Sequence, residues 1–404
     1  MSNSRALALL SGFVISALLL AACGSSPAPA GQGSGSATTG EPVKIGVLLT
    51  LSGSAGAVGE KQRIGIELAV ADINAAGGIL GRPVEIVVRD DAGDPTKART
   101  AAEELVAKEN VAFIIGPTLS SPAMAVNPYL TEQKVISLGS PAAAAATDPA
   151  NFPYAFTTAA DDALISRTLI GFALDTLNLQ RLAVLSESTA FGKASVAVQE
   201  TLFADRQYQP AAWLEYTSGD LDFSAQLRAA QEAGADGLII NSPNPADLTR
   251  FMKTLQSMGW EVPVLGTIVL SDATVIEGVG RDGMQHAYSY SNRPFTYSAS
   301  EPLAERTVEF REKVRARMGG ATPLKTSIEL TAAMYDGVHV LARAVERAGG
   351  FDADQVKAAL ESMEEYDGLY ATWQFTPTKH IAVSEDDLVM VIAGTCEDAV
   401  CQKP

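Results

Sequence analysis

Short, continuous hydrophobic runs alternate with longer amphipathic segments along most of the chain. Several of the runs are β-branched and aliphatic throughout, as strands buried on both faces require. Strand-like and helix-like segments that alternate over short connections are typical of an α/β protein with parallel sheets. The strands predicted in this way cover residues 44–50, 84–90, 111–117, 134–139, 181–186, 237–242, 262–267 and 285–290.

Three of the predicted helices carry clear end signals. Residues 63–74 place their apolar side chains mainly along one side, and the glycines at 77 and 78 favour termination. Residues 96–110 follow an Asp-Pro pair at the cap positions, and residues 327–349 form a third, long helix. These helices would cover the faces of the predicted sheets.

Two domains are expected, because about 360 residues remain after a tether at the amino end, more than one core usually holds. A change of composition over residues 154–162 separates two series of alternating elements, and we interpret it as a crossover. After Ser291 the chain returns to helices with few strand signals. We therefore expect it to revisit the first domain.

The amino end predicts export. Arg5 precedes an apolar run over residues 6–22 that stops at Cys23, so residues 1–22 form a signal peptide, too short for a comfortable membrane span. The sequence Leu-Ala-Ala-Cys at its end resembles the bacterial lipobox, which implies acylation of Cys23; an ordinary cleaved signal is the alternative. Residues 23–42 are rich in Gly, Ser, Pro and Ala, and form a flexible tether.

The net charge and the cysteine content restrict the classes of binding partner that the chain can have. Loss of Arg5 with the signal takes the net charge from −17 to −18, which argues against nucleic acid or anionic lipid as a partner of the folded domain. Any membrane contact would be through the lipid anchor. Cys396 and Cys401 favour a local disulfide in an exported protein, and no further cysteine or nearby histidine completes a metal site.

Glycine-rich motifs do not predict a nucleotide site. Residues 278–283 match G-x-G-x-x-G, but a helix-like segment precedes them and a strand-like segment follows, so a turn is favoured. A Walker-like segment ending at residues 191–195 has Glu187 at the first glycine position and Ala194 at the hydroxyl position. The loop over residues 48–59 lacks a phosphate-gripping lysine. No catalytic constellation, cofactor or metal is predicted.

Small and hydroxyl-bearing residues follow neighbouring strands. Loops 48–59, 117–122 and 138–142 would line one sheet edge, where α/β proteins bind ligands. Ser120 or Ser121 would cap a helix opened by Pro122, a role worth about 1 kcal/mol. In the functional interpretation, the N–H groups there and the hydroxyls hold a carboxylate or another anionic or polar group.

From Val43 to about His380 the chain resembles the periplasmic binding proteins for branched-chain amino acids, amides and related solutes, the receptors of ABC importers. The resemblance implies two α/β lobes with three crossovers near Thr157, Ser291 and Gly368, closing on a solute. The implied lobes are residues 43–157 plus 292–367, and 158–291 plus 368–404. The matching segments are KIGVLLTLSGSAGAVGEKQRIGIELAVADINAAGGILGRPVEIVVRDDAGDPTKA, FIIGPTLSSPAMAVNPYL, VISLGSPAAAAATDP, YAFTTAADD, AAMYDGVHVLARAVERAGG and YDGLYATWQFTPTKH.

The resemblance also implies site residues. Ser120 occupies the position that grips the ligand carboxylate, with Ser121 as a weaker neighbour. Gly139 and Ser140 lie on the adjoining loop that usually supplies a carbonyl and a hydroxyl or amide. From the second lobe, Asn244 falls where an aromatic side chain meets the ligand in leucine-type receptors.

Three departures from the family pattern bear on the ligand. Ile268 stands where amino-acid receptors carry a glutamate for the ligand ammonium, with Asp272 the nearest acid, and Val58 replaces a tyrosine. Gly93 and Leu119 replace both cysteines of a disulfide found in some relatives. Because an ammonium buried without an acid is costly, either Asp272 substitutes or the ligand lacks an α-amine.

We therefore expect a non-catalytic, lipid-anchored solute-binding protein that delivers a small polar solute (an amino acid, amide or carboxylate) to the permease and ATPase subunits of an ABC importer. The alternative is a ligand sensor of the same fold that signals to a membrane partner. An exported α/β enzyme is disfavoured, because no nucleophile and base are evident.

Overall fold

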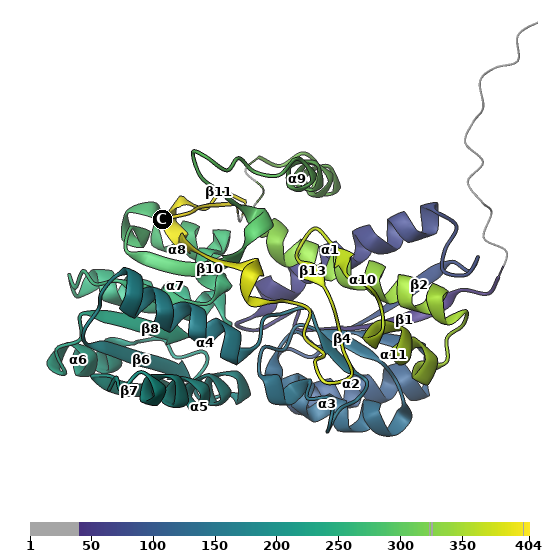
Figure 1. Ribbon diagram of the computed structural model, residues 1–404, viewed down its shortest axis with the longest axis horizontal. Coiled ribbons are helices and arrows are strands. Elements are labelled where there is room, and N and C mark those ends of the chain that lie inside the picture. The colour runs from purple at the N-terminus through teal and green to yellow at the C-terminus, as the bar shows by residue number, and fades with distance from the viewer. Residues whose placement is uncertain (1–39, 323, 325, 399) are drawn as a thin grey trace, which may run out of the picture. The chain divides into compact units, whose positions relative to one another are not determined.

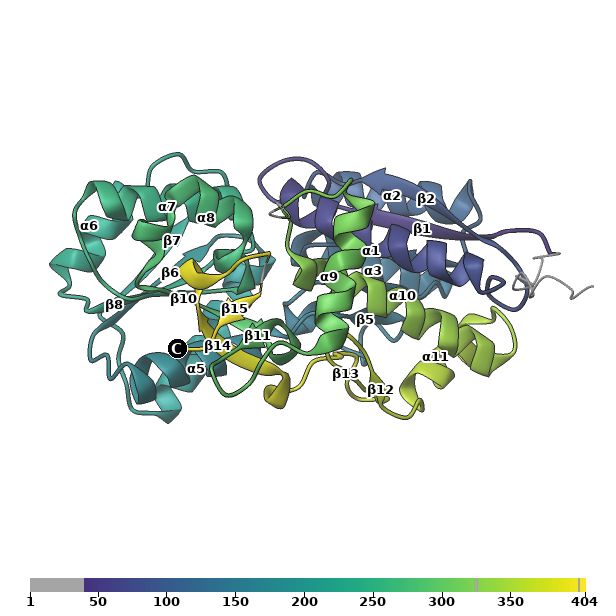
Figure 2. The same ribbon diagram turned by 90° about the horizontal axis from the view of Figure 1, so that it is seen from above.

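The computed structural model describes residues 40–322, 324, 326–398 and 400–404 (Figure 1). The predicted signal peptide, Cys23 and most of the tether lie outside these residues. The described chain builds two large sheets, which both views show as separate groups of strands (Figures 1 and 2). We call the sheet formed first along the chain, with its helices, the first lobe, and the other the second lobe.

The first sheet is parallel throughout, in the order β2-β1-β3-β4-β5. Ile45, Val47 and Leu49 pack with side chains of α1 and α10, whereas Leu48 packs with α2 and α3 on the opposite face. Its elements are β1 (Val43–Leu49), α1 (Gly56–Ala75), β2 (Val84–Asp90), α2 (Pro95–Ala107), β3 (Phe113–Ile115), α3 (Ser120–Gln133), β4 (Ser137–Gly139), β5 (Ala155–Thr157), α10 (Ile328–Ala348) and α11 (Ala353–Glu361).

The second sheet has the order β14-β10-β9-β8-β6-β7 and is parallel except for β14, which runs antiparallel to β10. Its helices are α4 and α5 on one face and α6, α7 and α8 on the other. The elements are α4 (Asp162–Gly171), β6 (Leu182–Glu187), α5 (Ala190–Asp205), β7 (Ala212–Tyr216), α6 (Ser224–Glu232), β8 (Gly237–Asn241), α7 (Pro245–Ser257), β9 (Val264–Gly266), α8 (Ala273–Val279), β10 (Ala287–Asn292) and β14 (Leu388–Ile392).

Smaller elements complete the described chain. Helix α9 (Glu305–Arg317) precedes α10, and two short strand pairs are formed by β11 (Thr296–Tyr297) with β15 (Cys401–Gln402) and by β12 (Tyr366–Asp367) with β13 (Thr372–Trp373). A disulfide joins Cys396 to Cys401, as the sequence favoured. Among the helices described, none combines the length and apolar character that crossing a membrane requires.

All eight predicted strands are present: β2 has the predicted bounds, and the other seven are shorter or shifted. The strands β5, β7 and β14 of the large sheets and the short strands β11, β12, β13 and β15 were not predicted. Helix α1 begins at Gly56, well before the predicted start, so residues 56–59 of the glycine-rich loop are helical. The glycines there permit close packing: a Cβ on Gly59 would lie 2.0 Å from the carbonyl oxygen of Thr50. This contact sets the first turn of α1 against the end of β1.

The third crossover differs from the prediction. The chain leaves the first sheet after Thr157 and the second after Asn292, as expected. At Gly368, however, it has not yet crossed back. His380 O accepts a hydrogen bond from Thr157 N (2.9 Å), and Ala382 N donates one to Thr157 O (3.2 Å), so these residues still extend the edge of the first sheet. The crossing comes between residue 382 and β14.

Candidate functional site

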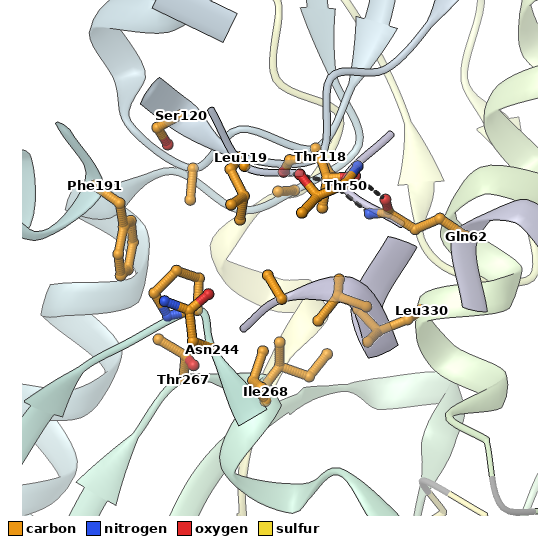
Figure 3. Close-up of a pocket in the computed structure, with 18 of the residues that line it drawn as sticks. Thr50, Gln62, Thr118, Leu119, Ser120, Phe191, Asn244, Thr267, Ile268 and Leu330 are labelled. Atoms are coloured by element: carbon orange, nitrogen blue, oxygen red, sulfur yellow. Dashed lines mark hydrogen bonds between the residues drawn. The ribbon is translucent and has the colours of Figure 1, made fainter. Parts of the chain in front are cut away.

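A cavity of about 200 Å³ lies between the two lobes, at the carboxyl ends of their parallel strands (Figure 3). Residues that follow the strands of both sheets line it, which is where open α/β sheets bind ligands. The strand-end residues are Thr50 after β1, Thr118 after β3, Ser140 after β4, Thr158 after β5, Glu187 at the end of β6, Pro243 and Asn244 after β8, and Thr267 after β9.

Most of the remaining lining is apolar, so the cavity suits a ligand with a hydrocarbon body. These side chains come from helices and loops of both lobes, and Figure 3 shows Leu119 and Ile268 on opposite sides of the cavity. They are Ala55, Val58, Ala92, Leu119, Ala142, Ala159, Ile165, Phe191, Ile268, Val269, Leu330 and Ala333, with the partly polar rings of Tyr290 and Tyr370.

The first-lobe wall is held by a network of neutral polar groups. Thr118 Oγ1 accepts a hydrogen bond from Thr50 N (3.1 Å) and donates to Gln62 Oε1 (2.7 Å). Gln62 Nε2 donates to Ser140 Oγ (2.6 Å), which in turn donates to Thr118 O (2.9 Å). Figure 3 draws part of this network. Because its members satisfy one another, the network makes a preorganised wall.

Three helices begin at the cavity without a side-chain cap. The residues in the cap positions of α3, α5 and α7 are Leu119, Thr189 and Asn244, and none accepts a hydrogen bond from its helix. The first N–H groups of a helix have no partner within it, and the helix dipole is positive at that end. Together, three such helix starts favour an anionic group in the cavity.

The second-lobe wall carries buried acids. Glu187 accepts hydrogen bonds from Thr189 Oγ1 and from Asn244 Nδ2 (3.1 Å). Asn244 Nδ2 also donates to Asp247 Oδ2 (3.2 Å) and Ser218 Oγ (2.6 Å). Burial raises the pKa of Glu187 to about 7, and the hydroxyl of Thr189 opposes this while the charge of Asp247 adds to it. This wall is therefore rich in hydrogen-bond acceptors.

Six of the eight residues proposed from the sequence line this cavity: Val58, Ser120, Ser121, Ser140, Asn244 and Ile268. The expectation that Ser120 or Ser121 caps its helix was wrong, because α3 already begins at Ser120. Ser120 Oγ instead accepts from Ala143 N (3.1 Å), and Ser121 Oγ accepts from Ala190 N of the second lobe (3.1 Å). Both hydroxyls tie together parts of the chain distant in sequence.

Gly139 and Asp272 do not line the cavity. The carbonyl of Gly139 accepts a hydrogen bond from Thr158 N (2.9 Å), and a Cβ there would lie 2.4 Å from Pro117 O, so this glycine serves close packing. Asp272 caps α8 and is buried in an ion pair with Lys61 of α1. The suggestion that Asp272 replaces the missing ammonium partner is therefore wrong, because its charge already has a partner.

Sequence reasoning missed Glu187, Gln62 and Thr158 as lining residues, and it placed Thr118 in a lining loop without singling it out. The rule that ligands meet strand ends would have found Glu187 and Thr158, since each ends or follows a strand. Gln62 lies inside a helix, where no local pattern distinguishes it. Within the part of the chain that the structure describes, no three His, Cys, Asp or Glu side chains are grouped to hold a metal ion.

Comparisons with known proteins agree with this geometry. A family model described as "Periplasmic binding protein" matches residues 42–395. The Leu/Ile/Val-binding protein homolog 7 of Brucella abortus (strain 2308) is 28% identical, over 82% of this chain and 83% of that protein. The leucine-, isoleucine-, valine-, threonine- and alanine-binding protein of Pseudomonas aeruginosa is 22% identical, over 80% of this chain and 83% of that protein.

Two solved structures share the fold. A branched-chain amino acid transporter substrate-binding protein from Streptococcus pneumoniae, in complex with isoleucine, has a TM-score of 0.77 and 22% identity, covering 90% of this chain and 100% of that one. A solute-binding protein of an ABC transporter from Rhodopseudomonas palustris BisB5, in complex with 3,4-dihydroxybenzoic acid, has a TM-score of 0.74 and 20% identity, covering 87% and 93%. At this identity the likeness shows the two-lobed fold alone.

Proposed function

Because the chain belongs to the periplasmic binding protein family, whose members bind substrates and are not enzymes, we propose that it captures a small carboxylate-bearing solute between its lobes and delivers it to an ABC importer. The observation that carries this proposal is the meeting of three uncapped helix starts at one cavity. Ala190 N of α5 donates to Ser121 Oγ and Pro245 of α7 has no N–H, but the other first N–H groups of these helices have no partner within the helix and favour a negative charge at this point.

The cavity also limits the size and polarity of the rest of the solute. Its volume of about 200 Å³ and its mostly apolar lining suit a compact hydrocarbon body better than a sugar or a peptide. The names of the relatives are consistent with this chemistry, since they describe proteins that bind leucine, isoleucine and valine, and one structure of this fold holds an aromatic acid. All of these ligands are carboxylates with a small apolar part.

Delivery would take place outside the cytoplasm. We infer that residues 1–22 direct export, that Cys23 is acylated, and that the tether over residues 23–42 lets the binding domain reach a membrane permease served by an ATPase subunit. The expected result is labelling by radioactive palmitate in bacterial cells, and its loss in Cys23→Ser. An unlabelled wild-type chain would contradict the anchor and leave solute binding untouched.

Solute binding is tested on the chain from Gly24 onward, unfolded and refolded to remove carried ligand. Thermal unfolding is followed with amino acids, short amides, urea, and aliphatic and aromatic carboxylates. A ligand at 100 times its dissociation constant should stabilise the protein by about 2.7 kcal/mol. The methyl ester of each hit is the control, because it keeps the body and loses the charge. Hits whose esters bind equally well, or hits among neutral compounds alone, would contradict a carboxylate site.

A further inference from the structure

We propose that Glu187 and Asn244 form an amine subsite on the second-lobe wall, so that the captured carboxylate is an α-amino acid. This inference rests on the proposed function and narrows its ligand class. It concerns an acid at the end of β6, whereas the position at which the resemblance places the ammonium partner holds Ile268, which has no charge.

The orientation of Asn244 supports the subsite. Its Nδ2 lies 3.2 Å from Oδ2 of Asp247, which is paired with Arg250, and an ionised carboxylate only accepts hydrogen bonds. The amide nitrogen must therefore face the acids, which turns Oδ1 away from them. Asn244 is 3% exposed, and its Oδ1 is buried without a hydrogen-bond partner among the residues described. A buried acceptor of this kind calls for a donor, and the ligand can supply one.

The charges of the wall are consistent with a cationic donor. Arg250 Nη1 pairs with Asp247 Oδ1 at 2.9 Å, so the charge of Asp247 is offset within the protein. The partners of Glu187 are a hydroxyl and an amide, which are neutral. Glu187 is 2% exposed, and an ammonium beside it would compensate a buried carboxylate that these neutral groups only solvate.

The subsite adjoins the helix starts that favour the carboxylate. Glu187 lies just before α5, and Ala190 N in the first turn of α5 donates to Ser121 Oγ in the first turn of α3. The subsite of Glu187 and Asn244 therefore lies beside the N–H groups at the start of α3. An α-amino acid carries its ammonium and carboxylate on one carbon atom, which matches two adjoining subsites of opposite preference.

The experiment compares ligands that differ only in the amine. Titration calorimetry at pH 8 measures the binding of L-leucine and 4-methylpentanoate, L-valine and 3-methylbutanoate, and L-phenylalanine and 3-phenylpropanoate. The protein is used as wild type, as Glu187→Gln, and as the control Glu200→Gln, which removes an exposed acid of α5. We expect the wild type and the control to favour the amino acid about 10- to 100-fold, the range for a hydrogen bond to a charged group. Glu187→Gln should lose that preference, so that the amino acid binds no more tightly than its deaminated analogue.

Wild-type protein that binds the deaminated acid as tightly as its amino acid would overturn the inference without any variant. So would Glu187→Gln if it weakened both members of a pair equally, since the residue would then only shape the wall. Either result leaves a carboxylate receptor in place. If no carboxylate in the broader thermal screen stabilises the protein, the proposed function itself fails, which distinguishes the two failures.

Discussion

The two walls of the cavity are built from the same kind of strand ends but offer opposite chemistry. The first-lobe wall presents hydroxyls and an amide that satisfy one another, from Thr50 through Thr118 and Gln62 to Ser140. The second-lobe wall presents Glu187 and an unpartnered oxygen of Asn244. Polar groups that already hydrogen-bond one another need no ligand. By contrast, Asn244 Oδ1 on the second-lobe wall and Thr158 Oγ1 on the first-lobe wall are buried without a partner among the described residues, and a ligand can supply one.

The largest effect is expected at the ion pair that joins the two lobes. Lys61 and Asp272 form a buried ion pair between α1 and the start of α8. Lys61→Met would leave Asp272 unpaired, at a cost of about 3–5 kcal/mol for a buried pair broken on one side. Because the pair joins the two lobes, we expect this cost to weaken ligand binding. Calorimetry should show a loss of affinity of about 100-fold or more.

Two further variants check that interpretation. Lys97→Met removes the same charge from an exposed position on α2 and should leave affinity unchanged. Lys61→Met combined with Asp272→Asn should recover much of the loss, because no buried charge remains unpaired. Unchanged affinity in Lys61→Met would show that the pair does not contribute to closure over the ligand.

The acid on the second wall predicts two opposite trends with pH. The pKa of Glu187 is about 7 in the folded chain against 4.5 when unperturbed, so the folded state keeps a proton that the unfolded state loses. Without ligand, its contribution to the free energy of unfolding should fall by up to about 1.4 kcal/mol per pH unit from 4.5 to 7. Affinity for an amino acid should rise over the upper part of this window, because the ammonium favours ionised Glu187.

Urea unfolding and calorimetry at pH 5, 6, 7 and 8 measure both trends. Asp162 and Asp336 titrate in the same window, with pKa values of about 6, so the difference between wild type and Glu187→Gln isolates the residue. Asp247, paired with Arg250, and the phenol of Tyr216 also face this acid, and their charges are common to both proteins. A difference that does not vary with pH would contradict the raised pKa.

The first wall should respond to the loss of a single hydroxyl. Thr118→Val keeps the shape of the side chain but strands Thr50 N and Gln62 Oε1 without their partner. We expect a loss of about 2 kcal/mol in the free energy of unfolding without ligand, the scale of a buried polar group left unpaired. Thr201→Val, at an exposed position of α5, is the control. A loss that appears only with ligand bound would contradict the preorganised wall.

The smallest effect is expected at the hydrogen bond between the walls. Ser121→Ala frees Ala190 N at the start of α5. A typical hydrogen bond contributes about 1 kcal/mol, so affinity should fall about fivefold. Unfolding without ligand should change little, because an opened cleft exposes both groups to water. A larger loss of unfolding stability than of affinity would mean that the contact persists without ligand.

The sequence predicted the positions that line the cavity better than it predicted which polar side chains there are available to a ligand. Small residues after hydrophobic runs marked Ser120, Ser121 and Ser140 as cavity positions. Asp272 was misjudged because its partner, Lys61, lies 211 residues away in the chain. Glu187, at the end of β6, was passed over because the strand-end rule was applied only to loops of small and hydroxyl-bearing residues.

Sequence alone determined the α/β class, the positions of most strands and the two-lobed family, since these depend on periodicity and on a resemblance that spans the chain. Tertiary structure alone decided which polar groups are already satisfied. Hydrogen bonds such as those of Gln62, and ion pairs such as Lys61 with Asp272, join residues from distant elements. Whether a buried acid such as Glu187 is available to a ligand depends on that pairing, which local patterns do not encode.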